Sequence, residues 1–171
     1  MHVRNEEIFL PRCLDYLATQ GVEVAILGNE STDRTPQIIR EYALHLNIHH
    51  EEIPYKGFFD LTSIMDRLGT WLEDIDADWF VLNSPDEILQ SDSPGETISE
   101  ALMRVDDAGF DVVNFFEYVF IPENETVSYG GRDHYREMRH YYYVAPRPVR
   151  IDAGMEETSG FAARRRRAPH V

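Results

Sequence analysis

The chain has 171 residues, of which 43% are hydrophobic and 12% aromatic, so it is long enough to fold as one domain around a hydrophobic core. Acidic residues outnumber lysine and arginine by 31 to 16, and the formal charge of −15 argues against general binding to nucleic acid or to an anionic membrane. No apolar run approaches the ~20 residues that span a bilayer, and the charged N-terminus does not resemble a signal peptide, so we expect a cytoplasmic protein.

The first part of the chain predicts short strands that alternate with helices. Residues 1–3 resemble the end of a strand, and residues 8–19 predict a helix with a proline in its first turn. The apolar, β-branched run at 22–27 predicts a buried strand, and a helix is expected over residues 35–46. The only cysteine, Cys13, lies among leucines of the first helix, so we expect a buried and unreactive thiol.

The same alternation continues along the chain. It predicts a strand at 47–53, a helix at 61–72, a strand at 79–82, a helix at 97–105 and a long strand at 111–121. This order predicts an α/β protein with a Rossmann-like, mostly parallel sheet and helices on both faces.

The C-terminal part has a weaker pattern. Residues 140–144 contain three consecutive tyrosines, which we interpret as a half-buried strand rather than as a surface on which sugars stack. Periodicity is lost from about residue 151, and four arginines follow at 164–167. We therefore expect one domain at residues 1–150 and a disordered tail at residues 151–171.

Three turns rich in polar residues follow predicted strands, at residues 4–7, 28–33 and 84–87. Ligands of open α/β sheets bind beyond the carboxyl ends of the strands, so these turns are expected to share one site. Asp86 and Glu87 are oxygen donors suited to a hard cation such as Mg²⁺ or Mn²⁺. The alternative is that Asp86 caps its turn and that Glu87 is merely solvated.

The turn at residues 29–35 contains side chains that cap a following helix: Ser31, Thr32 or Asp33 suits that role. Capping is compatible with a second role in lining a ligand pocket. Two carboxylates in the second half of the chain, Asp133 and Glu137, are candidates for a general base that accepts a proton from a substrate hydroxyl. The neighbouring histidines, His134 and His140, suggest a second metal site, but their spacing favours a polar surface loop.

Taken in order, these segments resemble the family 2 glycosyltransferases. Val3–Glu7 resembles the Arg-Asn-Glu opening of that family, Asn29–Thr35 its Ser-Thr-Asp-x-Thr turn, and Ala77–Trp79 with Asp86–Glu87 its Asp-x-Asp-Glu motif. The similarity covers residues 3 to about 89 and continues in looser form to Tyr143.

The resemblance implies a GT-A fold, a nucleotide-diphosphate sugar donor, an acceptor of unknown identity, and Mg²⁺ or Mn²⁺ near Asp86 and Glu87. It also implies which residues contact the donor, and these are Arg4, Asn5, Glu6, Asn29, Ser31 and Asp33.

Two positions depart from the family pattern. Gly28 stands where the family has an acidic residue after the second strand, and Ser84 stands at the first Asp of Asp-x-Asp. The chain also opens partway through the expected first strand, so we expect a shortened or degenerate relative. The alternative function is therefore a catalytically degenerate nucleotide-binding or interaction module with the same fold. A phosphatase would need a nucleophilic Asp after the first strand. This chain has Arg4, Asn5 and Glu6 there, which argues against a phosphatase.

Overall fold

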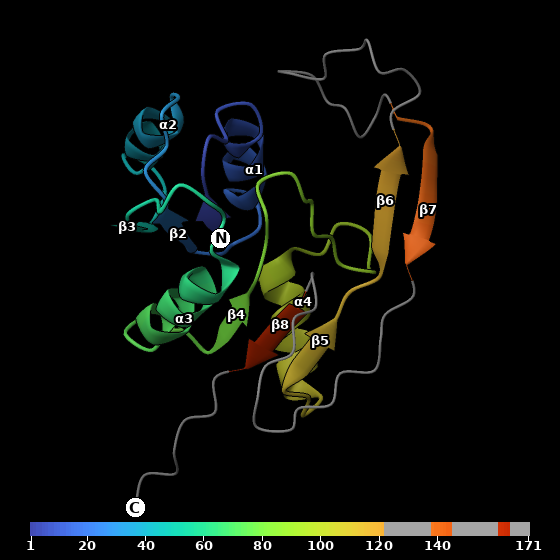
Figure 1. Ribbon diagram of the computed structural model, residues 1–171. Helices are drawn as coiled ribbons and strands as arrows, with labels where there is room; N and C mark the ends of the chain where they lie inside the picture. Colours follow the sequence, from blue (N-terminus) through green and yellow to red (C-terminus); the bar gives the residue numbers. More distant parts are fainter. Residues whose placement is uncertain (122–137, 145–160, 165–171) are drawn as a thin grey trace, which may run out of the picture.

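A computed structural model describes residues 1–121, 138–144 and 161–164 (Figure 1). In chain order the elements are β1 (His2–Val3), α1 (Leu10–Leu17), β2 (Val24–Gly28), α2 (Thr35–Tyr42), β3 (Ile48–Glu52), α3 (Leu61–Leu72), β4 (Trp79–Val81), α4 (Ile98–Asp107), β5 (Val112–Asn114), β6 (Glu117–Ile121), β7 (His140–Val144) and β8 (Phe161–Arg164). No helix of these described ranges is both long and apolar enough to cross a membrane.

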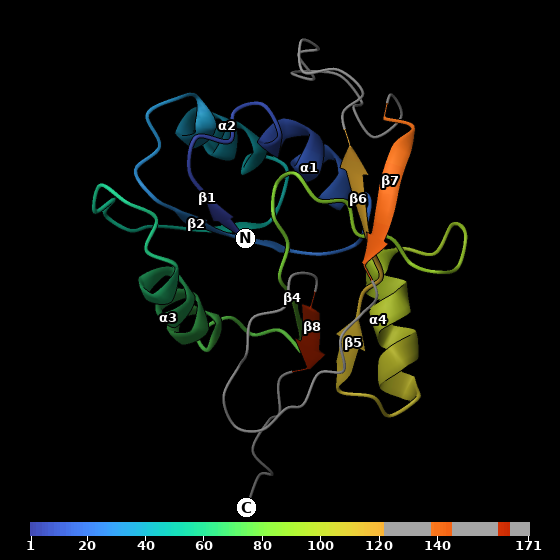
Figure 2. The ribbon, with the colours of Figure 1, turned by 45° about the vertical axis from the view of Figure 1, so that its right-hand side comes forward.

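The first three strands form a parallel sheet in the order β1-β2-β3, with β2 in the centre. Helices α1 and α2 cover one face of this sheet and α3 covers the other (Figure 2). The alternation of side chains along β2 explains this layering, since Val24 and Ile26 pack against α1 and α2 while Leu27 packs against α3. The structure is thus a mixed α/β fold consistent with the expected GT-A, Rossmann-like class.

The largest hydrophobic cluster lies between α1, α2 and the parallel sheet. It contains Met1, Val3, Leu10, Cys13, Leu14, Leu17, Val24, Ile26, Ile38 and Ile39. Leu10, Leu14 and Ile26 are completely buried. The helical spacing of the buried residues of α1 is the same spacing that predicts this helix from the sequence.

The second half of the chain departs from the expected mostly parallel arrangement. Strands β4 and β5 both pair with β8 in antiparallel register, and β6 pairs with β7 in a separate antiparallel sheet. The run expected as one long strand, at 111–121, is divided at residues 115–116 because its two parts belong to these different sheets.

Strand β8 lies inside the range for which a disordered tail was expected. Its backbone pairs Trp79 with Arg164 and Val112 with Ala163. Four residues are too few to show an alternating pattern, and pairing on both edges stabilises a strand through the backbone alone. The rest of residues 151–171 lies outside the described residues, so the extent of the domain stays a prediction.

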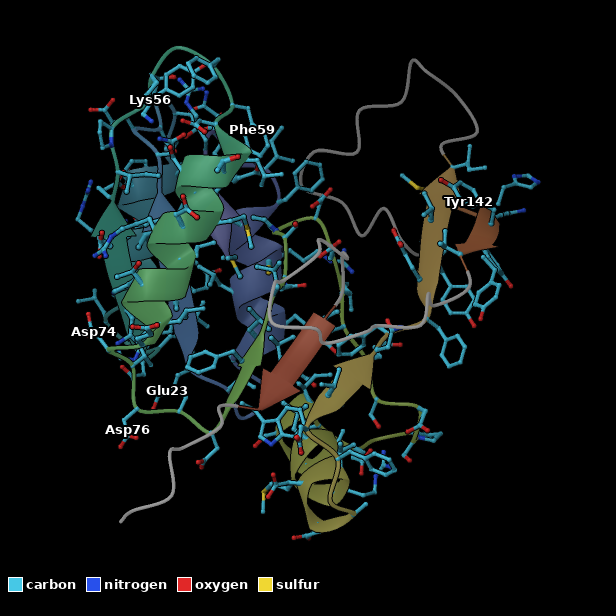
Figure 3. The ribbon with its side chains drawn as sticks, turned by 60° about the horizontal axis from the view of Figure 1, so that its bottom comes forward. Glu23, Lys56, Phe59, Asp74, Asp76 and Tyr142 are labelled. Atoms are coloured by element: carbon cyan, nitrogen blue, oxygen red, sulfur yellow. The ribbon has the colours of Figure 1, made fainter. Side chains whose placement is uncertain are left out.

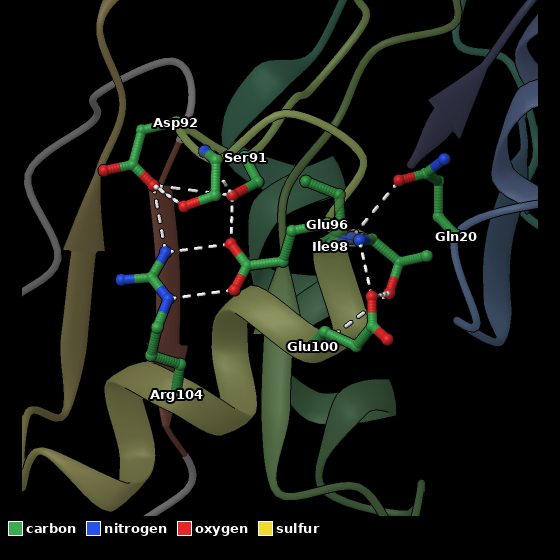
Figure 4. A network of polar contacts seen from close by, with 9 residues as sticks. Gln20, Ser91, Asp92, Glu96, Ile98, Glu100 and Arg104 are labelled. Atoms are coloured by element: carbon green, nitrogen blue, oxygen red, sulfur yellow. Dashed lines mark hydrogen bonds and ion pairs between the residues drawn. The ribbon is translucent and has the colours of Figure 1, made fainter.

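Helix α4 and the loop before it are joined by a network of charged side chains (Figure 4). The guanidinium group of Arg104 donates to Glu96 and to Asp92, each over 2.9 Å. The hydrogen bond from Arg104 is the main reason that the pKa of Glu96 falls to about 2, with a second contribution from Ser91. At the start of the helix, Thr97 and Glu100 form a capping box. These contacts anchor the loop that follows Asp86 and Glu87.

Candidate functional site

The loops after β1 and β2 bind each other directly. The backbone N–H of Asn5 donates to Ser31 Oγ over 3.1 Å, and the side-chain oxygen of Asn5 accepts from the backbone N–H of Thr32 over 2.8 Å. Carboxyl ends of adjacent parallel strands lie at the same sheet edge, which is why loops 26 residues apart in sequence can meet. Asn5 and Ser31, both expected at a donor site, therefore lie together.

A second set of bonds joins the first turn of α2 to the same loop. The buried hydroxyl of Thr35 accepts from the backbone N–H of Glu6 over 2.7 Å, and the Asp33 carboxylate accepts from the N–H groups of Glu7 and Thr35. Burial raises the pKa of Asp33, but these bonds from Thr35 and Glu7 outweigh it, so the pKa lies below its ordinary value. Asp33 thus binds the N–H of the first residue of α2, as expected for a residue near the helix start, although the N-cap position itself is Arg34, whose side chain makes no capping bond.

Both loops contain a residue in the left-handed backbone region. Asn5 has φ 58° and Glu30 has φ 49°. Asn tolerates this conformation, whereas Glu adopts it only when its surroundings impose it. The carboxylate of Glu30 accepts from the backbone N–H of Tyr55 over 2.8 Å and so clamps the loop to the segment after β3. Backbone strain of this kind concentrates at functional sites, which supports a role for the shared edge.

Arg4 is the first residue of the loop after β1, and its guanidinium carbon lies 3.6 Å above the centre of the Tyr55 ring. This is a cation–π contact, which holds the charge in place without neutralising it. Within the part of the chain that the structure describes, the Nε atom of Arg4 is buried and has no hydrogen-bond partner. The contact with Tyr55 thus fixes a positive charge in the loop after β1.

Asn29 has a structural role at the same edge. It is 4% exposed, its backbone N–H donates to Val3, and its side-chain amide donates to the carbonyl of Ile53 over 3.2 Å. These bonds join the ends of all three parallel strands. Asn29 also lines a cavity of about 180 Å³ between the strand ends and α3.

The other walls of that cavity were not expected from the sequence. They include Ile53, Lys56, Phe58, Asp60 and Arg67, which come from the segment after β3 and from α3. Lys56 donates to Asp60 and Ser63, while Arg67 pairs with Glu51 on β3. The run of aromatic and charged residues at 55–60 was the available signal, but only folding places it beside Asn29.

Gly28 has an acidic neighbour that takes up the space of its missing side chain. A Cβ atom added at Gly28 would lie 2.2 Å from Oε1 and 2.7 Å from Oε2 of Glu52. Glu52 is paired with Gly28 in the parallel sheet, and its carboxylate accepts from the backbone N–H of Glu30 over 3.2 Å. A carboxylate therefore lies at the end of β2 although β2 itself contributes none.

The turn after β4 follows a strand of a different sheet and contacts α1, where the side-chain amide of Asn83 donates to Cys13 Sγ. Asp86 is exposed, and its negative charge is felt at Glu6 of the first loop. Burial raises the pKa of Glu6, and the charges of Asp86 and Asp33 raise it further. Asp86 and Asp33, which belong to two different turns, are thus both close enough to Glu6 for their charges to act on it.

Glu87 is held in its turn rather than merely solvated, because its carboxylate accepts from the backbone N–H of Ser84 over 2.9 Å. Burial raises the pKa of Glu87, the bond from Ser84 lowers it, and the charges of Asp86 and Glu117 raise it. The net direction is upward. Four carboxylates from three parts of the chain therefore act on one another here: Glu6, Asp86, Glu87 and Glu117.

The chemistry of this place fits a hard cation, since burial and neighbouring negative charges raise the pKa values of Glu6 and Glu87, and a cation would offset that negative charge. Among the described residues, no three His, Cys, Asp or Glu side chains are grouped to hold a metal ion. A cation held by Asp86 would therefore also be coordinated by oxygen atoms of a bound ligand. The expected catalytic residues, Asp133 and Glu137, lie outside the described residues.

Cys13 is buried beneath this turn, where its sulfur accepts from the side-chain amide of Asn83 over 3.6 Å. Burial is the main reason that its pKa rises to about 11; the N-terminal ammonium opposes the rise, and Asp86 and Glu87 add to it. The thiol is therefore protonated at neutral pH, which confirms the expectation of a buried and unreactive cysteine.

Replacing Glu6 by Gln should stabilise the protein at pH 8 but not at pH 4.5. A carboxyl group whose folded pKa is raised binds its proton more tightly in the native state, so wild-type stability falls as pH rises from 4.5 through the folded value. Gln cannot ionise and avoids this loss. Thermal unfolding at both pH values tests the prediction. The control is Glu41→Gln, since Glu41 lies on the exposed side of α2. An equal gain for Glu6→Gln at both pH values would contradict it.

Comparison with known proteins agrees with this geometry over one part of the chain. Residues 1–57 match the family model described as glycosyl transferase family 2. A search of curated proteins found no match. The matched segment contains both interlocked loops, with Arg4–Glu7 and Asn29–Thr35, while Asp86 lies beyond it. The resemblance is thus confirmed over residues 1–57, which match part of the family 2 glycosyltransferase model, and this match supports a glycosyltransferase-like function.

Proposed function

We propose that the protein binds a nucleotide-diphosphate sugar at the carboxyl edge of the β1-β2-β3 sheet and transfers its sugar to an acceptor with the help of Mg²⁺ or Mn²⁺. The observation that carries the proposal is the interlocking of the Asn5 and Ser31 loops at the carboxyl ends of β1 and β2, and the charge of Asp86 acting on Glu6 supports it. A ligand of an open α/β sheet binds at such an edge.

The diphosphate is assigned to the region between Arg4 and Asp86. Arg4 offers a guanidinium charge held over Tyr55, and Asp86 offers exposed oxygens. When bound, a divalent cation would neutralise the diphosphate and stabilise it as a leaving group. Asp86 would hold that cation, and Glu87 would fix the turn through its bond to Ser84. Asp133 and Glu137 are proposed as carboxylates that accept the proton of the acceptor hydroxyl.

The nucleoside is assigned to the cavity beside Asn29. Ile53 and Phe58 present apolar surface there, and polar groups lie at its rim. Glu52 supplies a carboxylate at the position where family 2 sequences have an acidic residue and this chain has Gly28. A carboxylate at such a strand end suits hydrogen bonding to ribose hydroxyls.

A second candidate, a nucleotide-binding module without turnover, has one observation in its favour. Ser84 replaces a carboxylate, and Glu87 is occupied by the backbone of Ser84, so Asp86 is the carboxylate of this turn left open to a cation. The two functions differ in their products. Binding of a nucleoside diphosphate without hydrolysis or transfer of any nucleotide sugar would identify the module.

The direct test is thermal unfolding of the whole protein with uridine or guanosine diphosphate, with Mn²⁺ or with EDTA. A ligand that binds only the native state and is present at 100 times its Kd stabilises that state by about 2.7 kcal/mol. A clear rise in Tm is therefore expected with one diphosphate and Mn²⁺ together. Mn²⁺ alone and the diphosphate with EDTA are the controls. No rise with either diphosphate would reject both candidate functions.

A further inference from the structure

The small sheet formed by β6 and β7 has one face made entirely of aromatic side chains. Tyr118 pairs with Tyr143, and Phe120 pairs with Tyr141, so these four side chains point to the same side of the sheet. Phe116 lies two residues before Tyr118 and extends the row. We call this set the aromatic face, and it consists of Phe116, Tyr118, Phe120, Tyr141 and Tyr143.

The rings of the aromatic face contact one another across the strands. Phe116 stacks on Tyr143 with ring centres 5.9 Å apart, and Tyr118 contacts Tyr143 and Tyr141 at 5.6 and 5.5 Å. Phe120 contacts Tyr141 at 5.7 Å. These distances are typical of aromatic pairs that hold each other in place. The face is therefore an ordered row of rings.

Four of the five residues of the aromatic face are exposed, and Phe120 is half-buried. Tyr118 is 53% exposed and Tyr141 57%, and none of the five residues belongs to a hydrophobic cluster of the described part of the chain. The sequence predicts a half-buried tyrosine strand; the structure places the strand in the open, with a second row of rings beside it. Figures 1 and 3 show β6 and β7 to one side of the parallel sheet.

Charge and ring chemistry narrow the possible partner. The aromatic face has no charged residue, whereas the protein has a formal charge of −15, which repels anionic lipid and nucleic acid. Aromatic faces pack against the C–H faces of sugar rings, and tyrosine hydroxyls can bond to sugar hydroxyls at their edges. A neutral carbohydrate matches both properties.

The position of the strand relative to the candidate site gives the ligand a role. Glu117 is the first residue of β6, and its charge acts on Glu87 in the turn that contains Asp86. The start of β6 is therefore close enough to that turn for charges at the two places to interact. A five-residue strand spans roughly 17 Å, long enough for several sugar rings.

We propose that the aromatic face binds the acceptor, a neutral oligosaccharide lying along Tyr118, Phe120, Tyr141 and Tyr143 with one end at the Asp86 turn. Carbohydrate binding by this face follows from its own chemistry. The acceptor role rests on the proposed transferase function.

The experiment measures binding of neutral hexasaccharides by calorimetry to the full chain. Cello-, malto-, manno- and chitohexaose are the probes. Binding of at least one is expected, and the double variant Tyr118→Leu with Tyr143→Leu should weaken it roughly tenfold, because leucine keeps apolar bulk but loses ring stacking. The matched control is Tyr142→Leu, since Tyr142 lies between the other two tyrosines, is 53% exposed and points to the opposite face (Figure 3).

The control should bind within twofold of wild type. Native Tm values for each variant establish that weaker binding does not come from unfolding, and Tyr118→Phe with Tyr143→Phe, which keeps the rings, should retain most of the affinity. The proposal is overturned if no hexasaccharide binds, if Tyr142→Leu loses as much as the double variant, or if the face instead mediates self-association that the double variant abolishes. If a hexasaccharide binds but no nucleoside diphosphate raises the Tm, carbohydrate binding by the aromatic face stands and the transferase function is rejected.

Discussion

Leu14→Ala should lower the free energy of unfolding by about 2–5 kcal/mol. Leu14 is 0% exposed and lies in the centre of the cluster between α1, α2 and the parallel sheet. Its truncation removes buried methyl groups and leaves a cavity that the surrounding helix and strands can only partly close. The same cluster packs β1 and β2 against α1, so the positions of the loops that follow β1 and β2 depend on this cluster. Urea unfolding followed by tryptophan fluorescence measures the loss.

Leu44→Ala is the matched control, because Leu44 is 86% exposed. The same chemical change at this position should alter the free energy of unfolding by no more than about 0.5 kcal/mol. Equal losses for the two variants would mean that the cluster between α1 and the sheet does not stabilise the protein as described.

Asp86→Ala should abolish the rise in Tm that a nucleoside diphosphate and Mn²⁺ produce together. Asp86 is the exposed carboxylate of its turn, while Glu87 is half-buried and holds the turn through its bond from Ser84, so Glu87 is less open to a cation. The variant should also be slightly more stable than wild type without ligand at neutral pH, since removing its charge relieves Glu6 and Glu87. That opposite sign separates a lost ligand contact from a damaged fold.

Asp107→Ala is the control for this experiment. Asp107 is exposed in the last turn of α4, outside the three strand-end turns, and its replacement should leave the ligand-induced rise unchanged. Thermal unfolding of both variants with Mn²⁺ and the diphosphate measures the effect. A full rise in the Asp86→Ala protein would exclude Asp86 as the cation-holding residue.

The periodicity of the chain predicts several helices and strands well. The pattern at residues 61–72 predicts α3 with the bounds that the structure has, and the pattern at 140–144 predicts β7. Helices α1 and α2 are shorter than their patterns, because their last predicted turns are irregular. Such agreement is expected where one face of an element is buried, since burial imposes the spacing of apolar residues.

The candidate site is only partly predictable. The bonds of Asn5 to Ser31 and Thr32 could be anticipated as a meeting of two strand-end loops. The carboxylate of Glu52 beside Gly28 could not, because it depends on the register of β3 against β2. The same reason applies to β8, whose pairing with β4 and β5 leaves no periodic signal in four residues.

The sequence by itself determined the α/β order of elements, the polar turns at the strand ends and the family resemblance of the first part of the chain. These properties are local, since each depends on residue types within a few positions of one another. Only the tertiary structure decided that the charge of Asp86 acts on Glu6, that Glu52 takes the space beside Gly28, and that four rings of the aromatic face are exposed. Strand register and the packing of distant segments bring these groups together, and neither leaves a mark in the local pattern.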